Sequence, residues 1–241
     1  SAILEIVPAA GKETPLSVTC RPVCCPPEKH LVMKALRAVE KVSGQLPPVD
    51  IFLRKIVPDG AGLGGGSADA AATVRLLNGL FALGLTDATM AEICSTVGAD
   101  CPFFIYGRPM AASGTGTTLC PVDLPGLEGL TVVVTKPDIS ISTAEAYGGI
   151  TPSGTTWDLE QLAAGPRQNW KSDFINLFER PMAASHPEIG TLVDRFYEHG
   201  ACYAAMSGSG SAVFGLFESD ILAEKAAESV RPYATWCGPI L

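Results

Sequence analysis

The chain has 241 residues, of which 47% are hydrophobic and 17% charged, so it can bury a full core and is not a disordered acidic chain. Its formal net charge of −8 and the lack of a lysine or arginine cluster argue against a nucleic-acid partner. There is no run of about 18 apolar residues, so we expect no transmembrane helix or membrane partner.

Eight cysteines are spread along the chain, most of them among apolar neighbours: Cys20, Cys24, Cys25, Cys94, Cys101, Cys120, Cys202 and Cys237. An even count is compatible with disulfides, but a chain of this length does not need covalent staples. A zinc site built from Cys20, Cys24, Cys25 and His30 lacks a Cys-x-x-Cys pair and a second pair of ligands. We therefore expect buried thiols in the reducing environment of the cytoplasm.

The first half of the chain alternates between strand and helix signals. We expect strands at residues 3–7, 16–20 and 49–53. Helical spacing begins at Leu31 and stops at Gly44, a second helix is expected at 67–80, and Thr86-Asp87 signals the start of a third, which runs to about Val97. From residue 103 to residue 124 the sequence favours short strands and turns.

The second half begins with a β-branched strand at 131–135 and a hinge at Lys136-Pro137-Asp138. We then expect helices at 143–147, 157–164, 187–199 and 221–230, and strands at 202–206 and 212–217 around a Ser/Gly turn. This mixture predicts an α+β protein with two domains, at residues 1–138 and 139–241.

Residues 58–67 read Pro-Asp-Gly-Ala-Gly-Leu-Gly-Gly-Gly-Ser and lie between an expected strand and an expected helix. Glycines allow the backbone to adopt positive φ and to approach a ligand closely, so that successive N–H groups converge on phosphate oxygens. The stretch that follows has high helix propensity, and the N-terminus of a helix attracts an anion. The sequence therefore predicts a phosphate site.

Other loop types fit this stretch less well. A Walker A motif needs Gly-Lys-Ser/Thr, and no lysine lies between Lys55 and Lys136. A dinucleotide-binding fingerprint matches by glycine spacing, but Asp87, the nearest acid at the right distance, begins a helix. A protein-kinase loop lies in a hairpin and requires a His-Arg-Asp set that does not follow here. A turn that binds nothing is disfavoured because so many glycines cost backbone entropy.

The stretch Pro-x-Gly-Ala-Gly-Leu-Gly-Gly-Gly-Ser-x-Asp-Ala-Ala resembles the second motif of the GHMP kinases, and its triple glycine is the form seen in the 4-diphosphocytidyl-2-C-methyl-D-erythritol kinases. The resemblance implies that this stretch wraps the phosphates of ATP. The residues that it assigns to ATP are Lys55, Pro58, Asp59, Gly60, Ala61, Gly62, Leu63, Gly64, Gly65, Gly66, Ser67, Ala68 and Asp69. Ala68 stands where a serine is more usual.

Asp100 lies in Gly-Ala-Asp-Cys-Pro-Phe-Phe, between a helix end and an expected apolar strand. By itself, an aspartate that accepts hydrogen bonds from turn amides is the more ordinary role. The segment resembles the one that holds the catalytic aspartate of the GHMP kinases. The resemblance implies that Asp100 takes or orients the proton of a substrate hydroxyl while Mg²⁺ and loop dipoles stabilise the charge on the phosphoryl group.

Residues 205–214 join two expected strands, and their spacing alone predicts a plain hairpin turn. They resemble the third GHMP motif, which implies that Ser207, Gly208, Ser209 and Gly210 lie near the phosphates and the substrate. Residues 142–147 and 176–179 also resemble family segments, without individual roles. His30 stands where the family usually has Asn, and it is expected at the surface or at a helix N-terminus.

The resemblance implies a ribosomal-S5-like α/β N-terminal domain and a ferredoxin-like α+β C-terminal domain. It also implies ATP-dependent phosphorylation, with Mg²⁺, of a hydroxyl of a cytidine diphosphate-linked methylerythritol in the non-mevalonate route to isoprenoid precursors. We expect a monomer or weak homodimer, and no residue is assigned as a metal ligand.

Two motifs of the family, a Lys-x-Asn strand and an Asp-Gly-Tyr-His segment, do not occur in the sequence, and we expect the piece that carries them to be missing upstream. Two alternatives stay open. One is another GHMP kinase that acts on homoserine, mevalonate or a sugar, which the triple glycine disfavours. The other is a nucleotide-binding pseudoenzyme without turnover.

Overall fold

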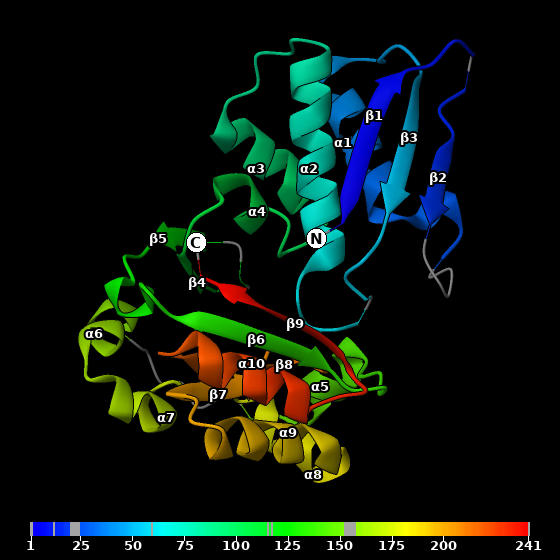
Figure 1. Cartoon of the computed structure of the whole chain (residues 1–241). Coiled ribbons are helices and arrows are strands. Elements are labelled where there is room, and N and C mark those ends of the chain that lie inside the picture. Colours follow the sequence, from blue (N-terminus) through cyan, green and yellow to red (C-terminus); the bar gives the residue numbers. More distant parts are fainter. Residues whose placement is uncertain are drawn as a thin grey trace. The chain divides into compact units, whose positions relative to one another are not determined.

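The computed structural model describes residues 2–11, 13–19, 25–58, 60–114, 116, 118–151 and 158–240. The chain divides into two compact units, one formed by residues 1–59 and 64–121 and the other by residues 60–63 and 122–241. This division falls before the strand at 131–136, whereas the sequence places the domain boundary after it, near residue 138; that boundary stays a prediction. Figure 1 shows the elements of each unit.

The first unit contains a three-stranded sheet in the order β1 (Ile3–Pro8), β3 (Val49–Arg54), β2 (Leu16–Thr19). β1 is antiparallel to β3 and β2 is parallel to it. Alternation along β3 directs Val49, Ile51 and Leu53 into the core. After η1 (Pro27–Lys29), the other elements of the unit are α1 (Leu31–Ser43), α2 (Gly65–Leu80), α3 (Asp87–Ser95), α4 (Phe103–Tyr106) and the β4 (Met110–Ser113)–β5 (Thr118–Pro121) hairpin.

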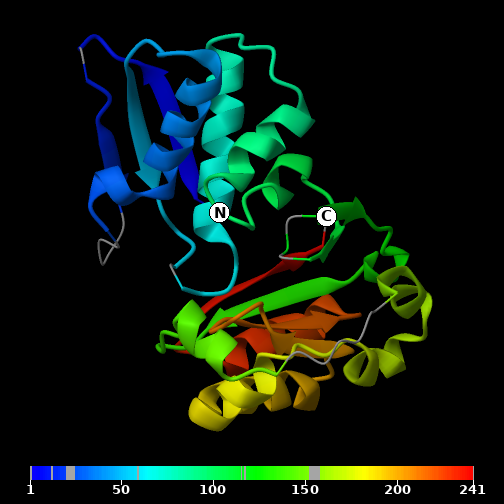
Figure 2. The same ribbon diagram turned by 180° about the vertical axis from the view of Figure 1, so that it is seen from behind.

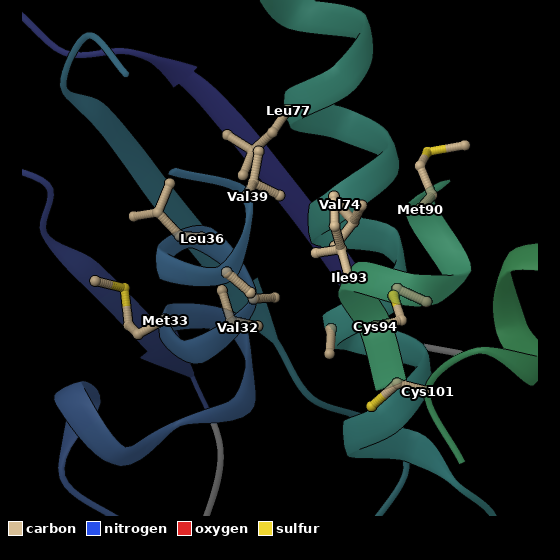
Figure 3. Close-up of a cluster of buried hydrophobic side chains, with 14 of the residues drawn as sticks. Val32, Met33, Leu36, Val39, Val74, Leu77, Met90, Ile93, Cys94 and Cys101 are labelled. Atoms are coloured by element: carbon tan, nitrogen blue, oxygen red, sulfur yellow. The ribbon is translucent and has the colours of Figure 1, made fainter. Parts of the chain in front are cut away.

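The core of the first unit is formed by side chains of the sheet and of α1, α2 and α3, with α3 packed on α1 and α2 (Figure 3). Val32, Leu36 and Val39 recur at helical spacing on α1, while Val74 and Leu77 do so on α2. All five side chains are buried. This packing fixes the direction of α2 and therefore the position of its N-terminus within the unit.

Two helix starts in this unit are set by side chains. The hydroxyl of Thr86 accepts a hydrogen bond from the Thr89 N–H at 3.2 Å, which confirms the predicted start of α3. His30 caps α1, because its Nδ1 accepts from the Val32 N–H at 3.3 Å. His30 is buried, so its placement at a helix N-terminus is confirmed and its alternative placement at the surface is wrong.

The segment after Asp100 differs from the prediction. We expected an apolar strand, and the structure has the short helix α4 instead. Pro102 precedes it with helical φ and ψ of −59° and −33°, and Gly107 ends it in the left-handed conformation. The run Phe-Phe-Ile-Tyr favours a strand by propensity, but the two flanking residues impose a helical turn.

The second unit has a four-stranded antiparallel sheet in the order β7 (Tyr203–Met206), β8 (Val213–Phe217), β6 (Thr131–Lys136), β9 (Ala234–Pro239). The principal connections, one from β6 to β7 and one from β8 to β9, are helical, which is the ferredoxin-like arrangement that was expected. The helices are α5 (Thr143–Gly148), α6 (Leu159–Ala164), α7 (Trp170–Asp173), α8 (Glu179–Ser185), α9 (Pro187–Glu198) and α10 (Asp220–Ser229), with 3-10 turns η2 (Pro125–Leu127) and η3 (Arg167–Asn169).

The two faces of this sheet are covered differently. Helices α9 and α10 pack on one face (Figures 1 and 2), where Phe196 of α9 meets Phe217 of β8. On the other face an aromatic cluster forms around Trp170, Phe174 and Tyr203, with edge-to-face rings. The predicted strands and the helices at 187–199 and 221–230 are confirmed to within two residues, whereas α7, α8 and the last strand, β9, were not foreseen. The predicted start of a helix at residue 157 lies outside the described residues.

The described cysteines are all free thiols. Cys94 and Cys101 are buried as expected, and burial raises the pKa of Cys94 to about 12. Cys120 is exposed, contrary to the expectation, and Cys25, Cys202 and Cys237 are half-buried. Cys20 and Cys24, and with them part of the alternative zinc site, lie outside the described residues. Among the helices that are described, none is long and apolar enough to cross a membrane.

Candidate functional site

The glycine loop leads from β3 into α2, as predicted, but the helix begins two residues earlier than expected, at Gly65. Gly64 precedes it in the left-handed conformation, with φ of 65°. A side chain at position 64 is also excluded sterically, because a Cβ there would lie 2.6 Å from the ring of Phe104. The Ala68 N–H donates to the Gly64 carbonyl, so the amides before Ala68 have no acceptor within the helix, an arrangement that favours an anion.

The first part of the loop lies directly on the turn between β7 and β8. Gly62 has φ of 72°, and a Cβ at this position would lie 2.1 Å from the Ser207 carbonyl oxygen. The Ser207 hydroxyl donates to the Gly62 carbonyl at 2.9 Å, and the Ala212 N–H donates to the Ala61 carbonyl at 3.0 Å. Two glycine-rich segments, 145 residues apart in the chain, therefore form one continuous backbone surface.

The turn between β7 and β8 is the predicted hairpin connection. It is closed by hydrogen bonds from the Ser207 N–H to the Ala212 carbonyl at 2.8 Å and from the Gly210 N–H to the Ser207 carbonyl at 2.9 Å. Gly208 and Gly210 both have positive φ. The Ser211 hydroxyl donates to the Ile139 carbonyl at 2.9 Å and ties the far side of the turn to the segment after β6.

Two side chains from residues 176–179 contact this turn, and sequence reasoning gave them no role. Asn176 donates to backbone carbonyls of the turn, and Glu179 accepts a hydrogen bond from the Met206 N–H at 2.6 Å. Burial raises the pKa of Glu179. A cavity of about 390 Å³ adjoins the same turn and is lined by Asn176, Met206 and Gly208 together with Asp173 and mostly apolar side chains. Resemblance to the family segment was the one signal that could have identified these residues.

Lys55 and Asp69, both predicted to bind ATP, form an ion pair with each other. The Lys55 ammonium lies 3.7 Å from the Asp69 carboxylate, and both side chains are about 95% removed from solvent. Lys55 immediately follows β3, and Asp69 lies in the second turn of α2. The pair therefore joins the two ends of the glycine loop within the first unit.

Asp100 is exposed in the turn between α3 and α4. The turn is held by hydrogen bonds from the Cys101 N–H to the Gly98 carbonyl and from the Phe104 N–H to the Cys101 carbonyl. Phe104 of α4 packs on Gly64 at the start of α2, and the Arg75 guanidinium of α2 donates to the Ile105 carbonyl. These contacts place the Asp100 turn beside the end of the glycine loop in the first unit.

The structure thus gathers the predicted residues in two groups. Gly64 to Asp69 lie with Lys55 and the Asp100 turn in the first unit, and residues 60–63 lie with Ser207 to Gly210 in the second. Asp59 lies outside the described residues. In the part of the chain that is described, no three His, Cys, Asp or Glu side chains gather as a metal site.

Comparison with known proteins identifies relatives over most of the chain. The family models "GHMP kinases N terminal domain" and "GHMP kinases C terminal" match residues 30–108 and 157–234. The 4-diphosphocytidyl-2-C-methyl-D-erythritol kinase of Parabacteroides distasonis is 47% identical over 215 residues, which cover 89% of this chain and 78% of that protein. The protein of the same name from Bacteroides fragilis is 46% identical over 194 residues, covering 80% and 70%.

A comparison of the fold with solved structures identifies kinases of the same kind. A 4-(cytidine 5'-diphospho)-2C-methyl-D-erythritol kinase matches with a TM-score of 0.81 and 31% identity, covering 98% of this chain and 85% of that one. A homoserine kinase from Cytophaga hutchinsonii matches with a TM-score of 0.74 at 16% identity, covering 99% and 85%, and so shares the fold.

The contact at Gly62 predicts that Gly62→Ala weakens nucleotide binding. The added methyl group would collide with the Ser207 carbonyl and disfavour positive φ, so we expect a loss of stability of about 1–3 kcal/mol together with a higher Kd for ATP. Thermal unfolding and calorimetric titration with ATP measure the two effects. Gly79→Ala in α2, where nothing lies near the new methyl group, is the matched control and should stabilise by about 0.5–1 kcal/mol. Equal changes of stability and of the Kd for ATP in the two variants would show that the contact with Ser207 does not constrain position 62.

The buried pair predicts a double-mutant result. Lys55→Met leaves the Asp69 carboxylate buried without its cation, and Asp69→Leu has the converse effect, so each should lower the free energy of unfolding by about 3–5 kcal/mol. The double variant Lys55→Met/Asp69→Leu should recover most of that loss, because neither charge then remains buried. Urea denaturation measures all three proteins. Additive losses in the double variant would show that the two side chains do not act as a pair.

Proposed function

The chain belongs to the 4-diphosphocytidyl-2-C-methyl-D-erythritol kinase family of the GHMP kinases, and from this membership we propose how its residues perform the reaction. It is an ATP-dependent kinase that phosphorylates a hydroxyl of 4-diphosphocytidyl-2-C-methyl-D-erythritol, in the supply of isoprenoid precursors. Homoserine and mevalonate kinases match at 16% and 11% identity, and these matches concern the fold alone.

The backbone of residues 60–67 binds the phosphates of ATP. One observation supports this assignment above all, namely the docking of Gly62 on the turn at Ser207 to Gly210. Closely packed glycines leave backbone amides, rather than side chains, on the surface that the two segments share. The N-terminus of α2 follows directly in the chain and adds the open amides of its first turn. A chain with a net charge of −8 can hold an anion locally in this way.

Lys55 and Asp69 hold this loop in shape. Because the Lys55 charge is paired with the Asp69 carboxylate, its contribution to the phosphate site is to fix the path from β3 to α2. The Thr73 hydroxyl supports the same turn of helix by donating to the Asp69 carbonyl at 2.8 Å. Lys55 and Asp69 thus act on the nucleotide mainly through the backbone that they position.

Asp100 receives or orients the proton of the substrate hydroxyl. Its support is an exposed carboxylate in a turn that is fixed to the start of α2 through Phe104 and Gly64. ATP supplies the phosphoryl group when bound, with Mg²⁺ neutralising part of its charge. Mg²⁺ in such sites binds mainly through phosphate oxygens and keeps several water ligands, and no side chain of the described residues is assigned to it.

We also propose that the protein acts in the cytoplasm as a monomer or weak homodimer, with a small-molecule substrate and no membrane or nucleic-acid partner. The buried free thiols of Cys94 and Cys101 fit a reducing compartment, and the net charge of −8 disfavours nucleic acid.

Asp100→Asn tests the proposed function. Loss of a general base lowers kcat by about 10²–10⁴-fold, while the Kd for ATP should not change because the phosphate-binding backbone is untouched. ADP release is measured with Mg-ATP in the presence and absence of 4-diphosphocytidyl-2-C-methyl-D-erythritol. Asp87→Asn, an exposed aspartate in the first turn of α3, is the control and should keep its turnover. Release of ADP that does not depend on the substrate, or full turnover in Asp100→Asn, would refute the proposal.

A further inference from the structure

Both donor hydrogens of the Asn176 carboxamide are bound by backbone carbonyls at the turn at Ser207 to Gly210. Its Nδ2 donates to the Met206 carbonyl and to the Gly208 carbonyl, both at 2.8 Å, and its Oδ1 accepts from the Phe178 N–H at 2.9 Å. An amide nitrogen has two hydrogens, and each has an acceptor here. The side chain therefore has no donor left for a ligand, and it acts through the turn.

Glu179 lies in the same segment as Asn176, residues 176–179, and also binds the backbone of Met206. Its Oε2 accepts from the Met206 N–H, so the N–H of Met206 is fixed by Glu179 and its carbonyl by Asn176. Met206 is the last residue of β7, immediately before the turn. The two side chains thus set the direction in which the turn leaves the sheet. The turn then meets Gly62 through the Ser207 hydroxyl.

The bond from Asn176 to the Gly208 carbonyl also orients the next amide. The peptide unit between Gly208 and Ser209 is planar and trans, so its N–H points away from its carbonyl. With the Gly208 carbonyl directed at Asn176, the Ser209 N–H is directed to the opposite side. Among the described residues, the Ser209 N–H has no hydrogen-bond acceptor.

We propose that Asn176, supported by Glu179, is a positioning residue that aims the Ser209 amide at a phosphate oxygen and holds the turn against Gly62. The inference rests on the proposed function, because it takes the nucleotide phosphates as the ligand of the turn. A preorganised backbone donor needs no rearrangement when charge develops on a phosphoryl group, which is why its orientation affects both binding and rate. Asn176 thereby affects turnover without contacting the reacting atoms.

Asn176→Asp is the sharpest variant. It keeps an acceptor for the Phe178 N–H, removes both donors and sets a carboxylate against two carbonyls. We expect the Kd for ATP to rise at least tenfold and kcat to fall. Without nucleotide, we expect faster hydrogen–deuterium exchange in the peptides that contain residues 60–63 and 207–210. Asn176→Ala, which adds no charge, should shift the same measurements in the same direction. It replaces Asn176→Asp in the test if the aspartate variant does not fold.

Asn78→Asp is the matched control. Asn78 makes the same kind of backbone contact, donating to the Leu85 carbonyl and accepting from the Leu85 N–H, both at 3.0 Å, but it lies in the last turn of α2 and binds the loop before α3. It should lose thermal stability without a change in the Kd for ATP or in exchange at the two glycine-rich segments. If Asn176→Asp behaves like Asn78→Asp, Asn176 only stabilises the fold and the inference is overturned.

The exchange and ATP-binding measurements do not depend on the identity of the second substrate. If the wild-type protein binds ATP but fails to phosphorylate 4-diphosphocytidyl-2-C-methyl-D-erythritol, the proposed substrate is wrong. The role of Asn176 is then still decided by whether its variants loosen the two glycine-rich segments and weaken the binding of ATP.

Discussion

The close approach of Gly62 to the turn at Ser207 to Gly210 is the constraint on which the candidate site depends. It brings two backbone segments together with no room for a Cβ, and hydrogen bonds on both sides of Gly62 fix their register. A phosphate group carries more charge than one amide can stabilise, so several amides must be directed at it. The contact at Gly62 makes amides from distant parts of the chain available on one surface.

Most of the remaining structure of each unit serves to support these backbone segments. In the first unit, the packing of α1 and α2 on the sheet sets where α2 begins, and the pair of Lys55 and Asp69 fixes the loop that precedes it. In the second unit, β7 and β8 present the turn, while Asn176 and Glu179 hold its base. In the proposed site, phosphate binding by backbone dipoles lets an acidic chain without a lysine or arginine cluster use ATP.

Much of this arrangement could be predicted from the sequence, because its signals are local. Alternation identified β3, a Thr-Asp start identified α3, and the glycines before a strong helix identified the loop that leads into α2. The four residues of α4 could not be predicted, since their β-forming side chains are overruled by Pro102 and Gly107. The roles of Asn176 and Glu179 depend on contacts about 30 residues away in the chain, which leave no periodic signal. For the same reason, the pairing of Lys55 with Asp69 was not foreseen, although both were assigned to the site.

The most direct test of the account is a crystal structure of the protein with a non-hydrolysable ATP analogue and 4-diphosphocytidyl-2-C-methyl-D-erythritol. We expect phosphate oxygens within hydrogen-bond distance of amides from residues 60–67 and from the turn at Ser207 to Gly210, with the Asp100 carboxylate beside the acceptor hydroxyl. Phosphates bound elsewhere, or bound by side chains with the Ser209 N–H left unused, would contradict it.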